Sequence, residues 1–171
     1  MSTEIQSWLL PVEPFEGESL SHFLGRFRRQ NHLSASALGD LAGVGAVIAR
    51  WERFHLNPFP SDAELAAVAE VVGVTMERLR QMLAPEGVGM KCEPIRLCGA
   101  CYQEEPYHRL EWQYESTGGC DVHRLRLLSK CRNCQKKFPI PALWDDGCCD
   151  RCRLPFIRMT KWQKPYQQIT Y

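Results

Sequence analysis

The sequence predicts a small helical domain of the helix-turn-helix type, followed by a metal-stabilised α+β domain made of two tandem zinc ribbons. Two observations lead to this fold class. The first half has apolar residues at helical spacing between capping residues, and the second half has four pairs of metal-ligand residues. We place the helical domain at residues 1–88 and the zinc-ribbon domain at residues 89–171. The metal sites are expected at about 95–130 and 131–157, before a flexible tail from Lys161 to Tyr171.

Five short helices are predicted in the first half. Ser19 opens the first, whose apolar residues follow the i, i+3, i+4, i+7 spacing of an amphipathic helix. Ser34, Ser61 and Thr75 are suited to cap three of the others. One shared apolar face would then form a compact core. The five stripes are Leu20, Phe23, Leu24 and Phe27; Ala37, Leu38 and Leu41; Val47, Ile48, Trp51 and Phe54; Leu65, Val68, Ala69 and Val72; and Met76, Leu79, Met82 and Leu83.

The second and third predicted helices are separated only by Gly43-Val44-Gly45, a spacing typical of helix-turn-helix proteins. The candidate recognition helix offers Arg50 and Arg53 to DNA, but it also carries Glu52. Sequence-specific binding usually needs several phosphate contacts. Two interpretations therefore stay open: DNA recognition, or docking of a partner protein through Arg50, Trp51 and Arg53, unless Trp51 packs in the core.

The four ligand pairs supply eight ligands, which close two tetrahedral zinc sites and leave no open position. The gaps between successive pairs are 18, 7 and 14 residues, and this long–short–long order favours sequential pairing. A cross-braced arrangement would use the same ligands. Two structural Zn²⁺ ions, each contributing about 10–16 kcal/mol in finger peptides, would decide the folding of this half. The pairs are Cys98/Cys101, Cys120/His123, Cys131/Cys134 and Cys149/Cys152.

The net charge of +1 conceals an asymmetry between the halves. Residues 1–90 hold 7 Lys and Arg against 11 Asp and Glu, whereas residues 91–171 hold 14 against 9. The basic half is the candidate neighbour of nucleic acid, and a solvated Lys- and Arg-rich surface is the alternative. The candidate contact residues are Arg124, Arg126, Lys130, Arg132, Lys136 and Lys137.

The remaining patterns argue against an enzyme or a membrane protein. There is no Gly-rich phosphate loop, Ser-His-Asp arrangement or carboxylate cluster, so no catalytic residue is predicted. Apolar runs are too short for a membrane span or a signal peptide, which predicts a cytoplasmic protein with reduced thiols. The segment Tyr107 to Tyr114 alternates apolar and polar residues, which predicts a strand whose aromatic side chains cover a zinc site.

The order of these motifs resembles the TniQ family over nearly the whole chain. The segment Gly17 to Phe27 (Gly-Glu-Ser-Leu-Ser-His-Phe-Leu-Gly-Arg-Phe) is followed by small helices, Cys-x-x-Cys, an aromatic-rich segment, Cys-x-x-His, Leu127-Leu128 and Cys-x-x-Cys. The small size and the segments Gly17 to Arg29, Arg50 to Phe54 and Cys98 to Cys101 resemble the short TniQ of type V-K CRISPR-associated transposons in prokaryotes.

This resemblance implies a non-catalytic adaptor in Tn7-like transposition and DNA integration. Such a protein would link an RNA-guided CRISPR effector and its guide-associated RNA to the AAA+ regulator TnsC. It would cap or nucleate a TnsC filament on DNA, so that the transposase is recruited. The alternative from the residues themselves is a zinc-containing helix-turn-helix transcriptional regulator.

Overall fold

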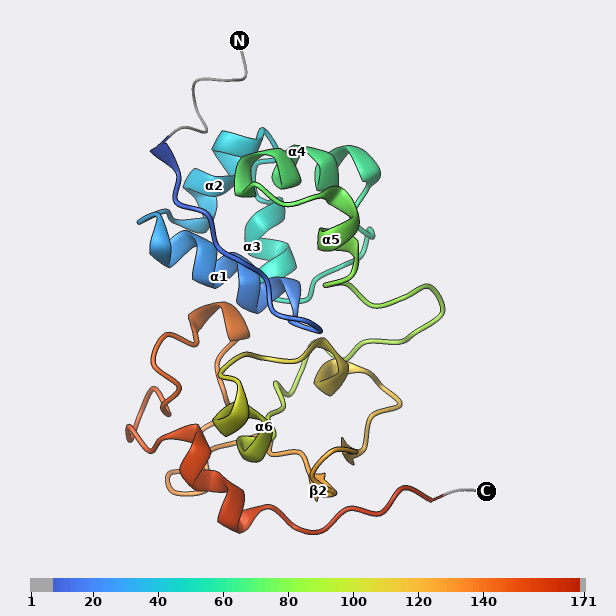
Figure 1. The fold of residues 1–171 in the computed structure, drawn as a ribbon, viewed down its shortest axis with the longest axis vertical. Helices are drawn as coiled ribbons and strands as arrows, with labels where there is room; N and C mark the ends of the chain where they lie inside the picture. Colours follow the sequence, from blue (N-terminus) through green and yellow to red (C-terminus); the bar gives the residue numbers. More distant parts are fainter. Residues whose placement is uncertain (1–7, 170–171) are drawn as a thin grey trace.

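The computed structural model describes residues 8–169, which form a helical half stacked on a cysteine-rich half (Figure 1). The predicted fold class is confirmed, because the chain is mostly helical with one small sheet and two cysteine clusters. The helical half contains α1 (Leu20–Gln30), α2 (Ala35–Ala42), α3 (Val47–Glu52), α4 (Asp62–Val72) and α5 (Met76–Arg80). The cysteine-rich half contains α6 (Gly99–Glu104), the 3-10 helices η2 (Leu110–Gln113), η3 (Pro141–Leu143) and η4 (Phe156–Trp162), and the antiparallel strands β1 (Gly119–Cys120) and β2 (Leu125–Arg126).

Side-chain caps begin the helices where the sequence predicts them. Ser19 and Ser34 each accept a hydrogen bond from a main-chain N–H in the first turn, as does Thr75. Ser61 and Glu64 form a reciprocal capping box at the start of α4. These caps satisfy N–H groups that have no partner inside the helix, so the boundaries of the short helices follow from the local sequence.

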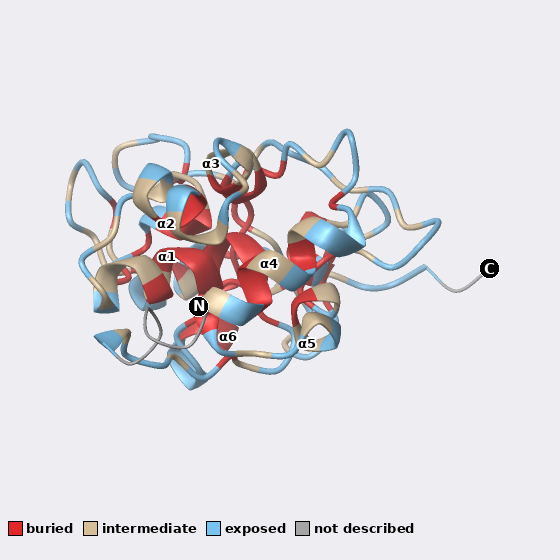
Figure 2. Cartoon of the chain, turned by 90° about the horizontal axis from the view of Figure 1, so that it is seen from above, coloured by how far each residue is buried: buried red, intermediate tan, exposed pale blue. Residues whose placement is uncertain are grey.

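The five helices pack around one apolar cluster. Most of the predicted stripe residues lie in it, and Phe23, Leu24, Leu38, Ile48, Val68 and Leu79 are completely buried. Trp51 is also part of this core and is 2 % exposed. The predicted contact of Trp51 with a partner protein is therefore corrected, since its side chain is used in packing. In Figure 2 the buried segments lie between α1, α3 and α4, with exposed loops around them.

Phe54 departs from the predicted third helix. α3 ends at Glu52, and Phe54 has a φ of 58°, which carries its side chain into the core of the cysteine-rich half. Phe54 matches the helical spacing of the apolar residues by coincidence, because it contacts the core of the other half and not the helical core.

The strand predicted from Tyr107 to Tyr114 is wrong. Its centre is η2, and the flanking residues form only isolated bridges, Glu18 with Arg109 and Met90 with Tyr114. Gln113, which the alternation does not place in the core, is completely buried. Its side chain accepts a hydrogen bond from the N–H of Arg96 (2.8 Å) and donates to the carbonyl of Lys91 (2.9 Å). A polar residue that is buried with hydrogen-bond partners cannot be distinguished from an exposed one in the sequence, so the alternation resembles that of an amphipathic strand.

The tail predicted to be flexible is instead docked as far as Tyr166. Pro165 forms a bridge with Leu125, and the N–H of Tyr166 donates to the carbonyl of Arg124 (2.8 Å). The buried side chain of Gln163 accepts from the N–H of Gly99 (2.9 Å) and donates to the carbonyl of Arg126 (2.9 Å). The last predicted residue of the tail, Tyr171, lies outside the described residues.

The two halves meet along α1 and η3. A Cβ atom at Gly25 would lie 2.2 Å from the carbonyl oxygen of Ala142, so only glycine allows this approach. The N–H of Ala142 donates to Ser21 Oγ (3.2 Å), and Arg29 donates to the carbonyl of Trp144 (3.0 Å). The segment from Pro85 to Pro94, which is the linker between the two halves, therefore joins parts of the chain that are already packed against each other. No helix in residues 8–169 combines the length and apolar character that a membrane span requires.

A buried polar cluster at the start of α1 reinforces this contact. Glu18 is completely buried, and its carboxylate lies 2.5 Å from His22 Nδ1 and 2.7 Å from Arg26 Nη2. Burial would raise the pKa of Glu18, but the hydrogen bonds with His22 and Arg26 outweigh it and the pKa is lowered. The neighbouring Ser19 donates its main-chain N–H to the carbonyl of His108 (3.0 Å), and its Oγ lies 2.9 Å from His108 Nδ1.

Candidate metal centres

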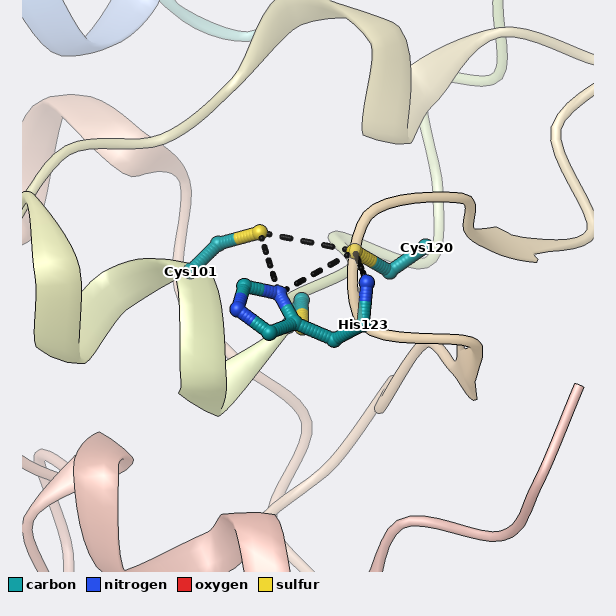
Figure 3. A group of neighbouring side chains, drawn as sticks. Cys101, Cys120 and His123 are labelled. Atoms are coloured by element: carbon teal, nitrogen blue, oxygen red, sulfur yellow. Dashed lines mark hydrogen bonds between the residues drawn. The ribbon is translucent and has the colours of Figure 1, made fainter.

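The first candidate metal centre brings together the first and second ligand pairs. Cys98 is the N-cap of α6, Cys101 lies in its first turn, and Cys120 and His123 come from β1 and the turn after it. Cys101 Sγ lies 3.4 Å from Cys120 Sγ and 3.2 Å from His123 Nδ1 (Figure 3). The distance from Cys98 Sγ to His123 Nδ1 is 3.9 Å. The imidazole therefore presents Nδ1 to the centre of the group.

The second candidate centre brings together the third and fourth pairs. Cys131 Sγ lies 3.5 Å from Cys152 Sγ, and Cys134 Sγ lies 3.6 Å from Cys149 Sγ. In each tetrad all four ligand atoms lie within 4.8 Å of one another. The pairing is thus sequential, as the gaps between the pairs favoured, and it is not cross-braced.

Three of the four pairs share one turn geometry. The residue directly after the second ligand has a positive φ in each of them: Arg124 (54°), Gln135 (64°) and Arg153 (65°). In the last two turns the chain then returns to pair with the first cysteine, and Cys131 N–H and Cys149 N–H donate across the turn. The pair Cys98/Cys101 differs because it opens a helix. None of the three residues is glycine, so the sequence lacked the usual signal for this conformation.

The geometry fits a tetrahedral metal ion. A Zn–S distance of about 2.3 Å implies ligand atoms about 3.8 Å apart, close to the distances in both tetrads. The thiols of the first tetrad also shift one another's pKa in opposite directions. Hydrogen bonds with Cys101 and Cys120 lower the pKa of Cys98 to about 2, whereas Cys120 and Cys98 raise that of Cys101. Neighbouring thiols cannot all ionise unless a cation balances their charge, so these tetrads are suited to hold metal ions.

A carboxylate that the sequence did not single out orients the histidine ligand. Glu104 Oε1 lies 2.7 Å from His123 Nε2, the ring nitrogen that faces away from the tetrad. Such a partner fixes the orientation of a ligating imidazole. The position of Glu104 three residues after Cys101, on the same side of α6, is the only sequence signal for it.

The six predicted nucleic-acid contacts are all exposed, but they form two groups. Lys130 and Lys137 face each other across an isolated bridge beside the second tetrad. The charge of Lys136 is balanced locally by Asp150, with 2.7 Å between Nζ and Oδ2. The groups are Arg124 and Arg126 beside the first tetrad, and Lys130, Arg132, Lys136 and Lys137 around the second.

The other two predicted contacts with a partner protein, Arg50 and Arg53, differ in exposure and in hydrogen bonding. Arg53 is exposed and lies just beyond the end of α3. Arg50 is half-buried and its guanidinium donates to the carbonyl of Asn57 (3.4 Å). Glu52, whose charge is unfavourable for DNA binding, is buried and paired with Arg28, with 2.5 Å between Oε1 and Nε. Of the three predicted residues, only Arg53 is both exposed and without a side-chain partner in residues 8–169.

The structure combines five packed helices with two tetrads of Cys and His ligands that are suited to hold metal ions. A model of the TniQ family matches residues 9–127, from the first described turns through the first tetrad. The match covers more than half of the chain, which therefore belongs to the TniQ family, a family of non-catalytic, transposon-associated adaptors. The chain has no match among the curated proteins with which it was compared.

Proposed function

We propose that this TniQ protein is a non-catalytic transposition adaptor that links RNA-guided target selection to the AAA+ regulator TnsC. The observation that carries the proposal is the packing of a helical half directly on a basic, metal-organised half, in a chain of this family. An adaptor must hold two binding surfaces in a fixed relation, and Gly25, Ser19 and Glu18 do this at the contact between the halves.

We further propose that both tetrads hold Zn²⁺. Three thiolates with one imidazole, and four thiolates, are ligand sets typical of structural zinc. The bound ions would neutralise the crowded thiolates and hold the turns together, and they would supply no reactive position. Around them, this chain orients His123 through Glu104 and closes the remaining turns through the main chain.

The two halves are proposed to contact different partners. The helical half is acidic overall and would contact TnsC, with Arg53 at its edge. The basic half would lie near guide-associated RNA or DNA, because its exposed Arg124, Arg126, Lys130 and Lys137 have no ion-pair partner within residues 8–169. Operator recognition by α3 is less well supported, since this helix has only six residues and buries Ile48 and Trp51.

The test is assembly with a TnsC protein. The adaptor, TnsC, ATP and double-stranded DNA are mixed, and co-sedimentation with the DNA filament is measured over a range of salt concentrations. We expect the chain to sediment only when TnsC is present. A chain that binds one particular duplex tightly without TnsC, and does not sediment with it, would contradict the proposal and favour a transcriptional regulator.

Charge-reversal variants on each half test which of the two proposed surfaces contacts nucleic acid. In assemblies that include the guide RNA, the double variant Arg124→Glu/Arg126→Glu is expected to weaken nucleic-acid-dependent assembly and lower the salt slope by about 2. The matched control is Arg78→Glu/Arg80→Glu, which changes the charge equally on the helical half. Equal effects of the two variants would remove the assignment of nucleic acid to the basic half.

A further inference from the structure

A groove crosses the outer surface where the two halves meet. It consists of a pocket of about 850 Å³ and a neighbouring one of about 600 Å³, and both are lined by His55 and Cys92. One wall is the segment from Arg53 to Phe59, which follows α3. The other is the linker that leaves α5, loops out at the right of Figure 1 and returns to the cysteine-rich half. The groove is separate from both metal tetrads.

The larger pocket is mainly apolar. Phe59 lines it and is 56 % exposed, although it is one of the larger apolar residues of the chain. Leu56, Val88 and Met90 contribute further apolar surface. Leaving such surface in water is unfavourable, and exposed apolar patches of this kind mark interaction sites.

The linker wall also offers an unpaired main-chain edge. Lys91 N–H donates to the carbonyl of Gln113 (2.7 Å), and Glu115 N–H donates to that of Gly89 (2.8 Å). Met90, opposite Tyr114 in this short antiparallel pairing, therefore directs its own N–H and C=O to the other side. Neither group has a hydrogen-bond partner among the described residues. An extended chain can add to such an edge through main-chain hydrogen bonds.

The charges of the residues that line the smaller pocket indicate which side chains an extended chain bound in the groove would carry. Arg53 and Lys137 line this pocket, one from each half, and neither has an ion-pair partner in residues 8–169. His55 is the third basic group there, and Glu93 is the one acidic residue of its lining. Glu86 belongs to the apolar pocket, further along the groove. An acidic side chain is therefore complementary to the end of the groove where Arg53 and Lys137 lie.

We propose that this groove binds an extended segment of a partner protein that carries a large apolar residue followed or preceded by acidic residues. The apolar side chain contacts Phe59 and Val88, the main chain pairs with Met90, and the acidic side chains face Arg53 and Lys137. Because the segment touches both halves, its binding requires their observed packing. The inference goes beyond the proposed function, since it holds whichever protein supplies the segment, and it assigns Lys137 to this segment instead of to nucleic acid.

The experiment is selection from a random dodecapeptide library displayed on phage, using the full-length zinc-loaded protein. We expect selected peptides to share one large apolar residue with nearby acidic residues. Synthetic copies should bind wild type and lose about tenfold in affinity, or about 1.4 kcal/mol, in Val88→Glu. Arg53→Glu/Lys137→Glu should weaken the same peptides and remove the preference for acidic residues.

Matched controls keep the outcome interpretable. Ile157→Glu places the same charge at an exposed apolar residue that lines neither pocket of the groove, and Arg158→Glu/Lys161→Glu reverses two exposed cations elsewhere on the basic half. Both are expected to leave peptide affinity unchanged, and zinc content and melting temperature verify the fold of every variant. Selected peptides without the apolar–acidic pattern, or with equal affinity for wild type and Val88→Glu, would overturn the proposal. Binding of an oligothymidylate in the groove, abolished by Arg53→Glu/Lys137→Glu, would overturn it in favour of nucleic acid.

Discussion

The helical and cysteine-rich halves reach a compact structure by different means. The helical half has five capped helices around one apolar cluster. The cysteine-rich half has two short strands, one six-residue α-helix and several 3-10 turns, and seven of its cysteines lie in the tetrads. Short irregular segments form few of the hydrogen bonds that stabilise regular structure, and the proposed metal ligation would supply the missing stability.

This difference shows that local sequence rules apply to one half and ligand geometry to the other. The two halves nevertheless form a continuous body, because Phe54 enters the second core and Gly25 allows η3 to approach α1. Glu18 and Ser19, which belong to the segment that resembles the TniQ family, both act at this contact between the halves. Its carboxylate holds the first turn of α1, and its serine both caps α1 and contacts His108.

The largest expected effect comes from removing one ligand of a tetrad. Cys131→Ser should reduce bound zinc from two ions to one and unfold the second tetrad, because each structural site contributes about 10–16 kcal/mol in finger peptides. Native mass spectrometry gives the stoichiometry. Cys148→Ser is the matched control, since Cys148 lies next to a ligand but outside both tetrads. A Cys131→Ser protein that still holds two ions would contradict the assignment.

The next largest effect is expected from the buried carboxylate at the contact between the halves. Glu18→Gln leaves His22 and Arg26 without their anion, and breaking a buried pair costs about 3–5 kcal/mol. Urea unfolding measures the loss. Glu16→Gln provides the control, because the Glu16–Arg78 pair is exposed and should change stability by less than about 1 kcal/mol. Equal losses would show that burial of Glu18 does not matter.

Two glycines distinguish the contact between the halves from the helical core. Gly25→Ala would place a Cβ 2.2 Å from Ala142 O, and Gly39→Ala would place one 2.0 Å from Gly45 O. Each should destabilise the chain by about 1–3 kcal/mol. Only Gly25→Ala should increase hydrogen exchange at Leu143 and Trp144, whose amides hydrogen-bond within η3. If Gly39→Ala increases it equally, the contact is not independent of the helical core.

The smallest effect is a pH dependence that arises from the same contact. Burial lowers the pKa of His22, and it lowers that of His108 well below the ordinary 6.5. Below pH 6.5 the unfolded chain binds protons at these histidines, whereas the folded chain keeps them neutral. The stability of the folded chain is therefore fully present above pH 6.5 and falls with decreasing pH, by up to about 1.4 kcal/mol per pH unit for each histidine. The lowered pKa of Glu18 acts in the same direction at lower pH.

Melting temperatures at pH 7.5 and 5.5 test this dependence, with a zinc indicator present to detect ion release. His22→Gln should flatten the pH dependence, whereas His32→Gln should not, because His32 is exposed. Identical pH profiles in the two variants would exclude the buried histidine as a source of the effect.

The sequence was most informative where one residue type has one local role. Ser19, Ser34, Ser61 and Thr75 set helix starts, and the spacing of the ligand pairs led to two sequential tetrads. It was less informative where the role of a side chain depends on a residue far away in the sequence. The roles of Glu104 and the buried Gln113 depend on partners that local patterns do not reveal.

The central claim is that metal ions organise the cysteine-rich half while the helical half has its own apolar core. Hydrogen exchange of the full chain, with and without a zinc chelator, tests it most directly. We predict that chelation removes protection from amides in residues 97–166 and leaves α1 and α4 protected, apart from the face of α1 that contacts η3. Simultaneous loss of protection in both halves, or none in either, would contradict the claim.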